Sequence, residues 1–223
     1  MAEQPLVSVR GEASAEVEPE IAVVSITVVA QDTSRQEAVV RLGERSAHLA
    51  ATLDEFADAV EKTETSGVSI RPEFKDGKPR ERVAGYVAAM VTRVTVHDLS
   101  RLGDLVARVG ILEMTEIAGL SWQLRRDSPL YRATRVDAVR DAVRRAAEYA
   151  AALDAHLTGL VEVADTGLGM ARGELRPFAG TASPARSSTF AGGPDAVLDL
   201  TPASQTVRAQ VEARFTMSEP TLG

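Results

Sequence analysis

The stretch VSVRGEASAEV, residues 7–17, alternates small or apolar residues with polar ones. One face carries Val7, Val9, Ala13, Ala15 and Val17. A period of two is typical of a strand with one buried face. Pro19 ends this pattern, and the β-branched run IAVVSITVVA follows at residues 21–30. Because the connection is so short, the sequence predicts an antiparallel hairpin of these two strands.

The period then changes to that of a helix. Ser34 and Glu37 have the spacing of a capping box, and apolar residues recur at helical spacing as far as Val60, which predicts a helix over residues 34–62. The patterns that follow predict strands at 67–72 and 83–96 paired as a hairpin, a helix from 98 to 110, a strand at 118–124, a helix from 128 to 153, and strands at 160–164 and 205–217.

Two of these expected elements allow more specific predictions about packing. Trp122 falls on the apolar face of its strand, so we expect it to be buried beneath a helix. The 128–153 helix begins with Ser128 and Pro129, a favourable pair for a helix start, and carries alanines along one face. So many alanines predict that this helix lies unusually close to whatever it covers.

The resulting order is β-β-α-β-β-α-β-α-β-β. Nearly every long strand has one apolar and one polar face, whereas a parallel sheet covered on both faces gives continuous apolar runs. The sequence therefore predicts an α+β fold with two layers, in which helices cover one face of a largely antiparallel sheet. We expect a single domain over residues 1–223, with a mobile, Gly-, Pro- and Ser-rich loop at about 167–204.

Composition excludes several classes of function. The chain has 223 residues, a net charge of −7 and no cysteine. It therefore has no disulfide, thiol nucleophile or cysteine-ligated metal. The acidic balance argues against binding to nucleic acid, which needs a basic face. No apolar run is long enough to span a membrane, and the first residues do not form a signal peptide, so we expect a cytoplasmic protein. A location in the cell envelope is the alternative if a signal was removed.

No catalytic constellation emerges from the sequence. The histidines, His48, His97 and His156, have neither the spacing of a helical metal site nor an adjacent nucleophile. The glycines at 167, 169 and 173 are spaced one residue too far apart for a dinucleotide-binding loop. We therefore predict no catalytic, cofactor-binding or metal-binding residue, and no cofactor.

Several short motifs occur together in a fixed order. They are the residues at 7–11, 17–21, 68–72, 85–86, 97–99, 102–103, 117–122, 151–153, 201–204 and 207–211, among them VSVRG, VSIRP and IAGLSW. In this order they resemble the SIMPL domain, a family of unknown function that includes bacterial periplasmic immunogenic proteins. The resemblance covers residues 6–217. It implies an α+β fold, ring- or channel-like homo-oligomers at the cell envelope and a link to stress tolerance, and it assigns no catalytic residues.

The leading functional hypothesis is therefore a non-enzymatic, self-associating protein with a stress-related role. The alternative is a module that binds a small ligand or a partner protein through its polar sheet face and the 167–204 loop. An enzyme with an unfamiliar site is a third hypothesis. The strand 205–217 has neither proline nor lysine to protect a sheet edge, so we expect pairing there. Its outward residues form the candidate interaction face: Arg208, Gln210, Glu212 and Arg214.

Overall fold

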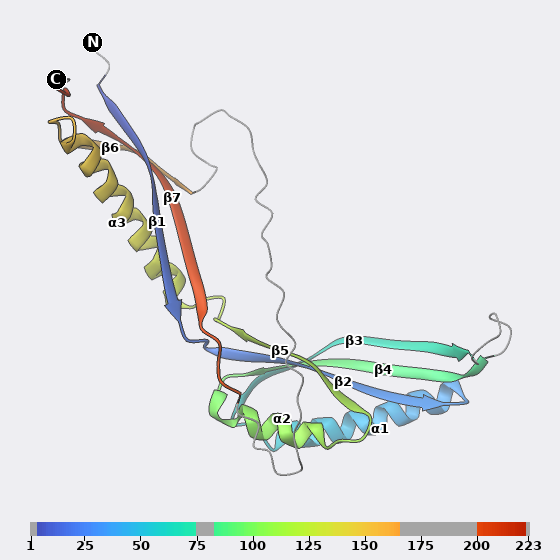
Figure 1. Ribbon diagram of the computed structural model, residues 1–223. Helices are drawn as coiled ribbons and strands as arrows, with labels where there is room; N and C mark the ends of the chain where they lie inside the picture. Colours follow the sequence, from blue (N-terminus) through green and yellow to red (C-terminus); the bar gives the residue numbers. More distant parts are fainter. Residues whose placement is uncertain (1–3, 75–82, 166–199, 222–223) are drawn as a thin grey trace. The chain divides into compact units, whose positions relative to one another are not determined.

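The computed structural model describes residues 4–74, 83–165 and 200–221 (Figure 1). The elements are β1 (Leu6–Val17), β2 (Ile21–Asp32), α1 (Arg35–Asp54), β3 (Val60–Phe74), β4 (Val83–Val96), α2 (Leu102–Gly110), β5 (Thr115–Gln123), α3 (Pro129–Ala151), β6 (Leu157–Asp165) and β7 (Gln205–Met217). A 3₁₀ turn, Leu99–Arg101, precedes α2. This order and the antiparallel sheets confirm the predicted α+β class. Most of the predicted loop at 167–204 lies outside the described residues.

The strands divide between two sheets, and the chain forms two compact units. The first unit contains β1, α3, β6 and β7, and the second contains β2 to β5 with α1 and α2. The predicted pairing of β1 with β2 is wrong, because β1 pairs with β7 while β2 lies between β4 and β5. A short connection allows a hairpin but does not require one, and here residues 18–20 join strands of two different sheets. The assignment of residues 1–223 to one domain stays a prediction.

The second unit is a four-stranded sheet in the order β3-β4-β2-β5. Alternate residues of the central strand β2, from Ala22 through Ala30, are buried beneath α1 and α2, which lie on the same face (Figure 1). The predicted pairing of β3 with β4 is confirmed. Trp122 is only partly buried, although it packs against this core as expected.

The end of α1 differs from the prediction. Ser34 caps the helix as expected, accepting a hydrogen bond from the Glu37 N–H. The helix ends at Asp54, however, and the buried residues Phe56 and Ala59 lie in the turn that follows. Their spacing continues the apolar pattern of the helix, which is why the sequence extended it too far. β3 then begins at Val60 and is longer than predicted, because its mostly exposed residues give no alternation.

The first unit is a three-stranded sheet in the order β1-β7-β6, with α3 packed on one face. The buried stripe of α3 is small residues four apart, namely Thr134, Ala138, Ala142, Ala146 and Ala150. Gly11 of β1 lies against this stripe. A Cβ atom added to Gly11 would lie 2.0 Å from the carbonyl oxygen of Ala138 and 2.6 Å from the amide nitrogen of Ala142. The predicted close approach of the alanine-rich helix is therefore confirmed.

Gly11→Ala should destabilise the protein. The added methyl group meets helix backbone, which cannot rotate away as a side chain would, so we expect the free energy of unfolding to fall by about 2–4 kcal/mol. Urea denaturation followed by circular dichroism measures it. The matched control is Gly43→Ala in α1, where an added Cβ has no neighbour within 4 Å. The control should be neutral or stabilising by up to about 1 kcal/mol, and equal losses in both variants would contradict the close packing.

Candidate functional site

The candidate interaction face predicted from the sequence lies on the outer face of β7. Three of its four side chains contact β1. Glu212 pairs with Arg10 at 3.3 Å, Gln210 Nε2 donates to Glu12 Oε1 at 3.4 Å, and Arg214 Nε donates to Ser8 Oγ at 3.3 Å. Each step forward along β1 matches an equal step backward along β7, so the two strands are antiparallel. These side chains therefore stabilise a strand pair within the chain.

Arg208 is the remaining member of this face. It is exposed, and with Gln210 it lines a shallow depression of about 380 Å³ shared with Glu12 and Ser14 of β1. The expectation that β7 is a sheet edge is wrong, because β7 lies between β1 and β6. The alternating pattern correctly assigned the face of each residue but carried no information about the neighbouring strands. Binding of a partner to these four residues stays a prediction.

The outer edge of β1 is bound by α3. The N–H of Glu12 points away from β7 and donates to the Asp141 carboxylate at 3.0 Å. Asp141 also contacts Arg144 and Arg145, and only 9% of its side chain is exposed. The hydrogen bond from Glu12 and the two arginines together lower the pKa of Asp141 below its usual value. A charged group thus occupies the edge at which another strand would pair with β1.

Asp141 also shows which way each flank of α3 faces. Successive residues of a helix are about 100° apart, so Val139 and Val143 lie on the flank opposite Asp141, across the buried stripe. Because Asp141 faces the free edge of β1, these two valines face toward β7 and β6. Both are partly exposed.

β6 is the other edge of this sheet, and α3 leaves it uncovered. Leu160 pairs with Phe215 and Val163 pairs with Ala213, whose side chains are buried under α3. Leu160 and Val163 therefore lie on the helix side of the sheet, yet they are 59% and 45% exposed. We call the four aliphatic residues Val139, Val143, Leu160 and Val163 the β6 shelf. The sequence pattern did not predict this shelf, although the run Leu160-Val161-Glu162-Val163 does break the simple alternation.

The four sheet edges differ in how well they are protected against pairing. Edge strands are usually protected by proline, lysine, other charges or a covering element. β3 carries Lys62, Pro72 and several carboxylates, β1 is bound by Asp141, and β5 has no large exposed aliphatic residue. β6 has neither proline nor lysine, and among the described residues it has a neighbouring strand on one side only. In the described part of the chain, β6 is the edge strand that combines the absence of proline and lysine with a run of exposed aliphatic side chains, at Leu160, Val161 and Val163.

The histidines do not come together. His48 lies in α1 and lines a pocket of about 460 Å³ with Arg41, Glu44 and Arg45. His97 follows β4, and His156 precedes β6. In the described part of the chain, no group of three or more histidine, aspartate or glutamate side chains is arranged to hold a metal ion. None of the helices in that part is long and apolar enough to cross a membrane.

Comparison with known families agrees with the motif order found in the sequence. Residues 7–215 match the family described as SIMPL, protein of unknown function (DUF541). The chain belongs to the SIMPL family. The match covers both units of this SIMPL protein and ends within β7, two residues before that strand does. No curated protein matches the chain. The family description names no activity and so assigns no role to any residue of the β6 shelf or of the β7 face.

Asp141→Ala should weaken the first unit in a pH-dependent way. At pH 7 we expect a loss of about 1–2 kcal/mol in the free energy of unfolding, because the Glu12 N–H loses a charged acceptor. The folded-state pKa of Asp141 is lowered, so its stabilisation is complete above the unfolded pKa of about 3.9 and is lost as the pH falls through the folded value. Urea denaturation at pH 7 and pH 3 measures the difference between wild type and variant, which should shrink in acid.

The matched control is Asp137→Ala on the same helix. Among the described residues Asp137 pairs with Arg140 alone, and both side chains are mostly exposed, so the loss should be within about 0.5 kcal/mol at either pH. The account would be contradicted if Asp141→Ala lowered the free energy of unfolding equally at both pH values, or by no more than Asp137→Ala does. Either result would show that the Asp141 carboxylate does not hold α3 to β1.

Proposed function

We propose that this SIMPL protein is non-enzymatic and self-associates through the edge of β6 and the β6 shelf. The observation that carries the proposal is an edge strand with exposed Leu160 and Val163 beside the exposed valines of α3. A strand edge offers backbone N–H and C=O groups to a second strand, and the adjacent aliphatic side chains supply apolar surface to bury.

The simplest assembly is a twofold dimer in which β6 pairs with β6 of a second copy. Antiparallel pairing of two identical strands is self-complementary, as a twofold interface requires. The two three-stranded sheets would then form one continuous sheet. Fully burying an aliphatic side chain contributes about 1.5–3 kcal/mol. The shelf residues are already partly covered, so eight of them across the dimer should contribute less per residue. A net binding free energy of about 6–7 kcal/mol is needed for association at tens of micromolar.

The alternative, a module that binds a ligand or partner through its polar sheet face, has less support in the first unit. Three of the four outward side chains of β7 already contact β1 there. The apolar surface lies on the helix side of the sheet, at β6. The stress-related role and the cytoplasmic location stay predictions.

Leu160→Lys should convert the assembly to monomers. The wild-type chain is expected to have the mass of a dimer or a larger closed oligomer at tens of micromolar, as measured by light scattering coupled to size-exclusion chromatography. A lysine on the shelf would place two like charges in the twofold interface and remove apolar contact area, so the variant should elute as a monomer with an unchanged circular dichroism spectrum.

Val68→Lys is the matched control, because Val68 is an equally exposed aliphatic residue on β3, the edge of the other sheet. This variant should remain assembled. A wild-type chain that stays monomeric at tens of micromolar would refute self-association and favour the binding-module alternative. Dissociation of Val68→Lys with retention of Leu160→Lys would move the interface to β3.

A further inference from the structure

The outer edge of β1 carries the backbone groups that a further strand would need. In a strand paired on one side, alternate residues turn their N–H and C=O groups toward the neighbour, and the others turn them away. The N–H of Glu12 points away from β7, so the backbone groups of Ser8, Arg10 and Ser14 point away from it as well. Among the described residues, β7 is the one strand beside β1. The β1-β7-β6 sheet therefore ends in a strand edge on each side.

Two open edges on one sheet would allow assembly to continue indefinitely. If β6 of one copy paired with β1 of the next, each added copy would offer a new open edge, and such a head-to-tail contact builds a filament unless its rotation closes a ring. Pairing of β6 with β6 uses the same strand of both copies and closes at two. Whether β1 can accept a strand therefore decides how far self-association proceeds.

The Asp141 carboxylate obstructs the β1 edge near its middle. β1 has 12 residues, and Glu12, close to the centre of the strand, donates its N–H to Asp141 Oδ2 at 3.0 Å. Paired strands lie about 4.8 Å apart, so the carboxylate fills space in which the backbone of a further strand would run. The carbonyl oxygens of that strand would also approach a negative charge. A strand could pair along the whole of β1 only by displacing Asp141.

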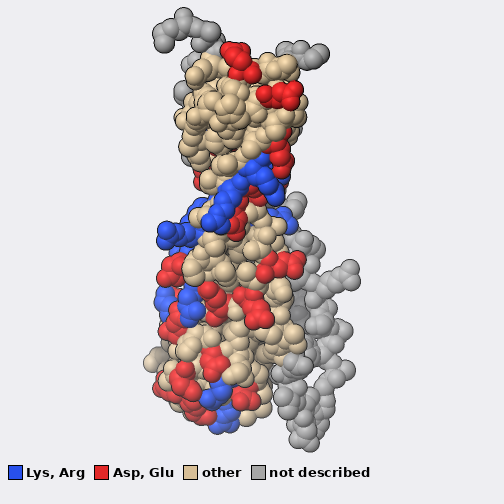
Figure 2. Space-filling view, turned by 90° about the vertical axis from the view of Figure 1, so that its left-hand side faces the viewer, with Lys and Arg blue, Asp and Glu red and all other residues tan. Residues whose placement is uncertain are grey.

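Two arginines and a glycine hold Asp141 in this position. Arg145 Nε lies 2.8 Å from Asp141 Oδ2, Arg144 pairs with Oδ1, and 9% of the aspartate side chain is exposed. Figure 2 views the side of the molecule on which α3 lies in Figure 1, and it shows acidic and basic side chains next to one another along this unit. Gly11 lets α3 lie close enough to β1 for the carboxylate to reach the edge. Displacing Asp141 would break its ion pairs as well as its hydrogen bond.

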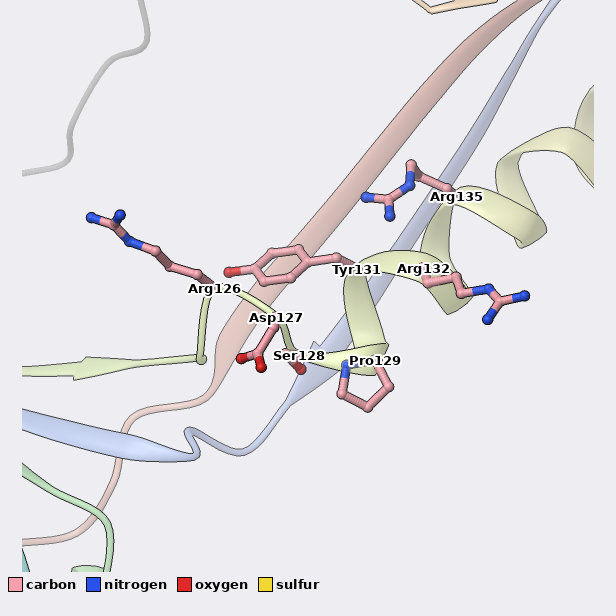
Figure 3. Close-up of a pocket in the computed structure, with 7 residues that line it drawn as sticks. All are labelled: Arg126, Asp127, Ser128, Pro129, Tyr131, Arg132 and Arg135. Carbon is pink, nitrogen blue, oxygen red and sulfur yellow. The ribbon is translucent and has the colours of Figure 1, made fainter. Parts of the chain in front are cut away.

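The arginines at the start of α3 are arranged differently. Arg126, Arg132 and Arg135 line an open depression and form no ion pair with any described residue. Figure 3 shows their side chains pointing in different directions around the helix start. Two arginines on one carboxylate are therefore a feature of Asp141 and not of the arginine-rich helix as a whole.

We propose that Asp141 blocks the β1 edge against a second copy of this chain and so confines self-association to β6. The strand that it excludes is β6 of another copy, because β6 is the edge with exposed aliphatic side chains and neither proline nor lysine. The identity of the excluded strand rests on the proposed function. The Asp141–Glu12 hydrogen bond is then an autoinhibitory contact that keeps the assembly closed.

Asp141→Ala should convert the closed assembly to larger species. With the β1 edge open, β6 of one copy can pair with β1 of the next, so the average mass at tens of micromolar should be at least about twice that of wild type and should rise with concentration. Light scattering coupled to size-exclusion chromatography measures it. Asp141→Asn keeps an oxygen acceptor for the Glu12 N–H and should retain the wild-type mass.

Two further variants separate opening of the edge from loss of stability. Arg144→Gln/Arg145→Gln loosens the same carboxylate through exposed side chains, so it should also raise the mass, by less than Asp141→Ala does. Val211→Ala truncates a buried side chain of the central strand β7 and alters neither edge, so it should keep the wild-type mass. Larger species in Val211→Ala as well would show that destabilisation causes the growth, and would overturn the proposal.

The same measurements distinguish this proposal from the proposed function. If wild type assembles and Asp141→Ala has the same mass, the block at β1 is refuted while the β6 contact stands. If wild type is monomeric but Asp141→Ala associates, the β6 contact fails and the block at β1 is supported. Monomers in both would refute both. Asp141→Ala combined with Leu160→Lys has one usable edge and should stop at two copies, and larger species in that variant would contradict growth through β6.

Discussion

At Gly11 the backbone of a strand lies directly against the backbone of a helix. A Cβ atom at this position would come within 2.0 Å of a helix carbonyl oxygen, so only glycine fits without moving α3. The alanines that face β1 meet the same requirement from the helix side, because each is small enough to let the two backbones approach. This contact holds α3 over β1. The Asp141 carboxylate then accepts a hydrogen bond from the N–H of Glu12 at the outer edge of that strand.

The position of α3 determines which parts of the sheet remain uncovered. A helix centred nearer to β6 would bury Leu160 and Val163, but a helix held close to β1 leaves them exposed. One edge of the sheet is therefore bound by a charged side chain, and the other edge, β6, has exposed aliphatic residues and no second neighbouring strand in the described part of the chain. This difference between the β1 and β6 edges follows from Gly11, which lets α3 lie close to β1. In our proposal the difference directs self-association to β6.

The sequence predicted those features that depend on neighbours along the chain. Examples are the Ser34 and Ser128 caps, the alternating faces of β1 and β7, and the close approach of the alanine-rich helix. It predicted the pairing of β3 with β4 from the turn between them, but it did not predict the neighbours of β1 and β7, since alternation assigns a residue to a face and says nothing about the adjacent strand. β7 was therefore expected at an edge, and β1 beside β2. The β6 shelf was missed for a related reason, because its exposure depends on where α3 lies.

Hydrogen exchange of β6 tests the central claim most directly. In our account the outward amides of residues 157–165 exchange quickly at submicromolar concentration and become protected as the concentration rises to tens of micromolar. The edge strand β3, at residues 60–74, should exchange at a rate independent of concentration. If exchange in β6 does not change with concentration, or if β3 becomes protected instead, the placement of α3 does not direct assembly to the β6 edge.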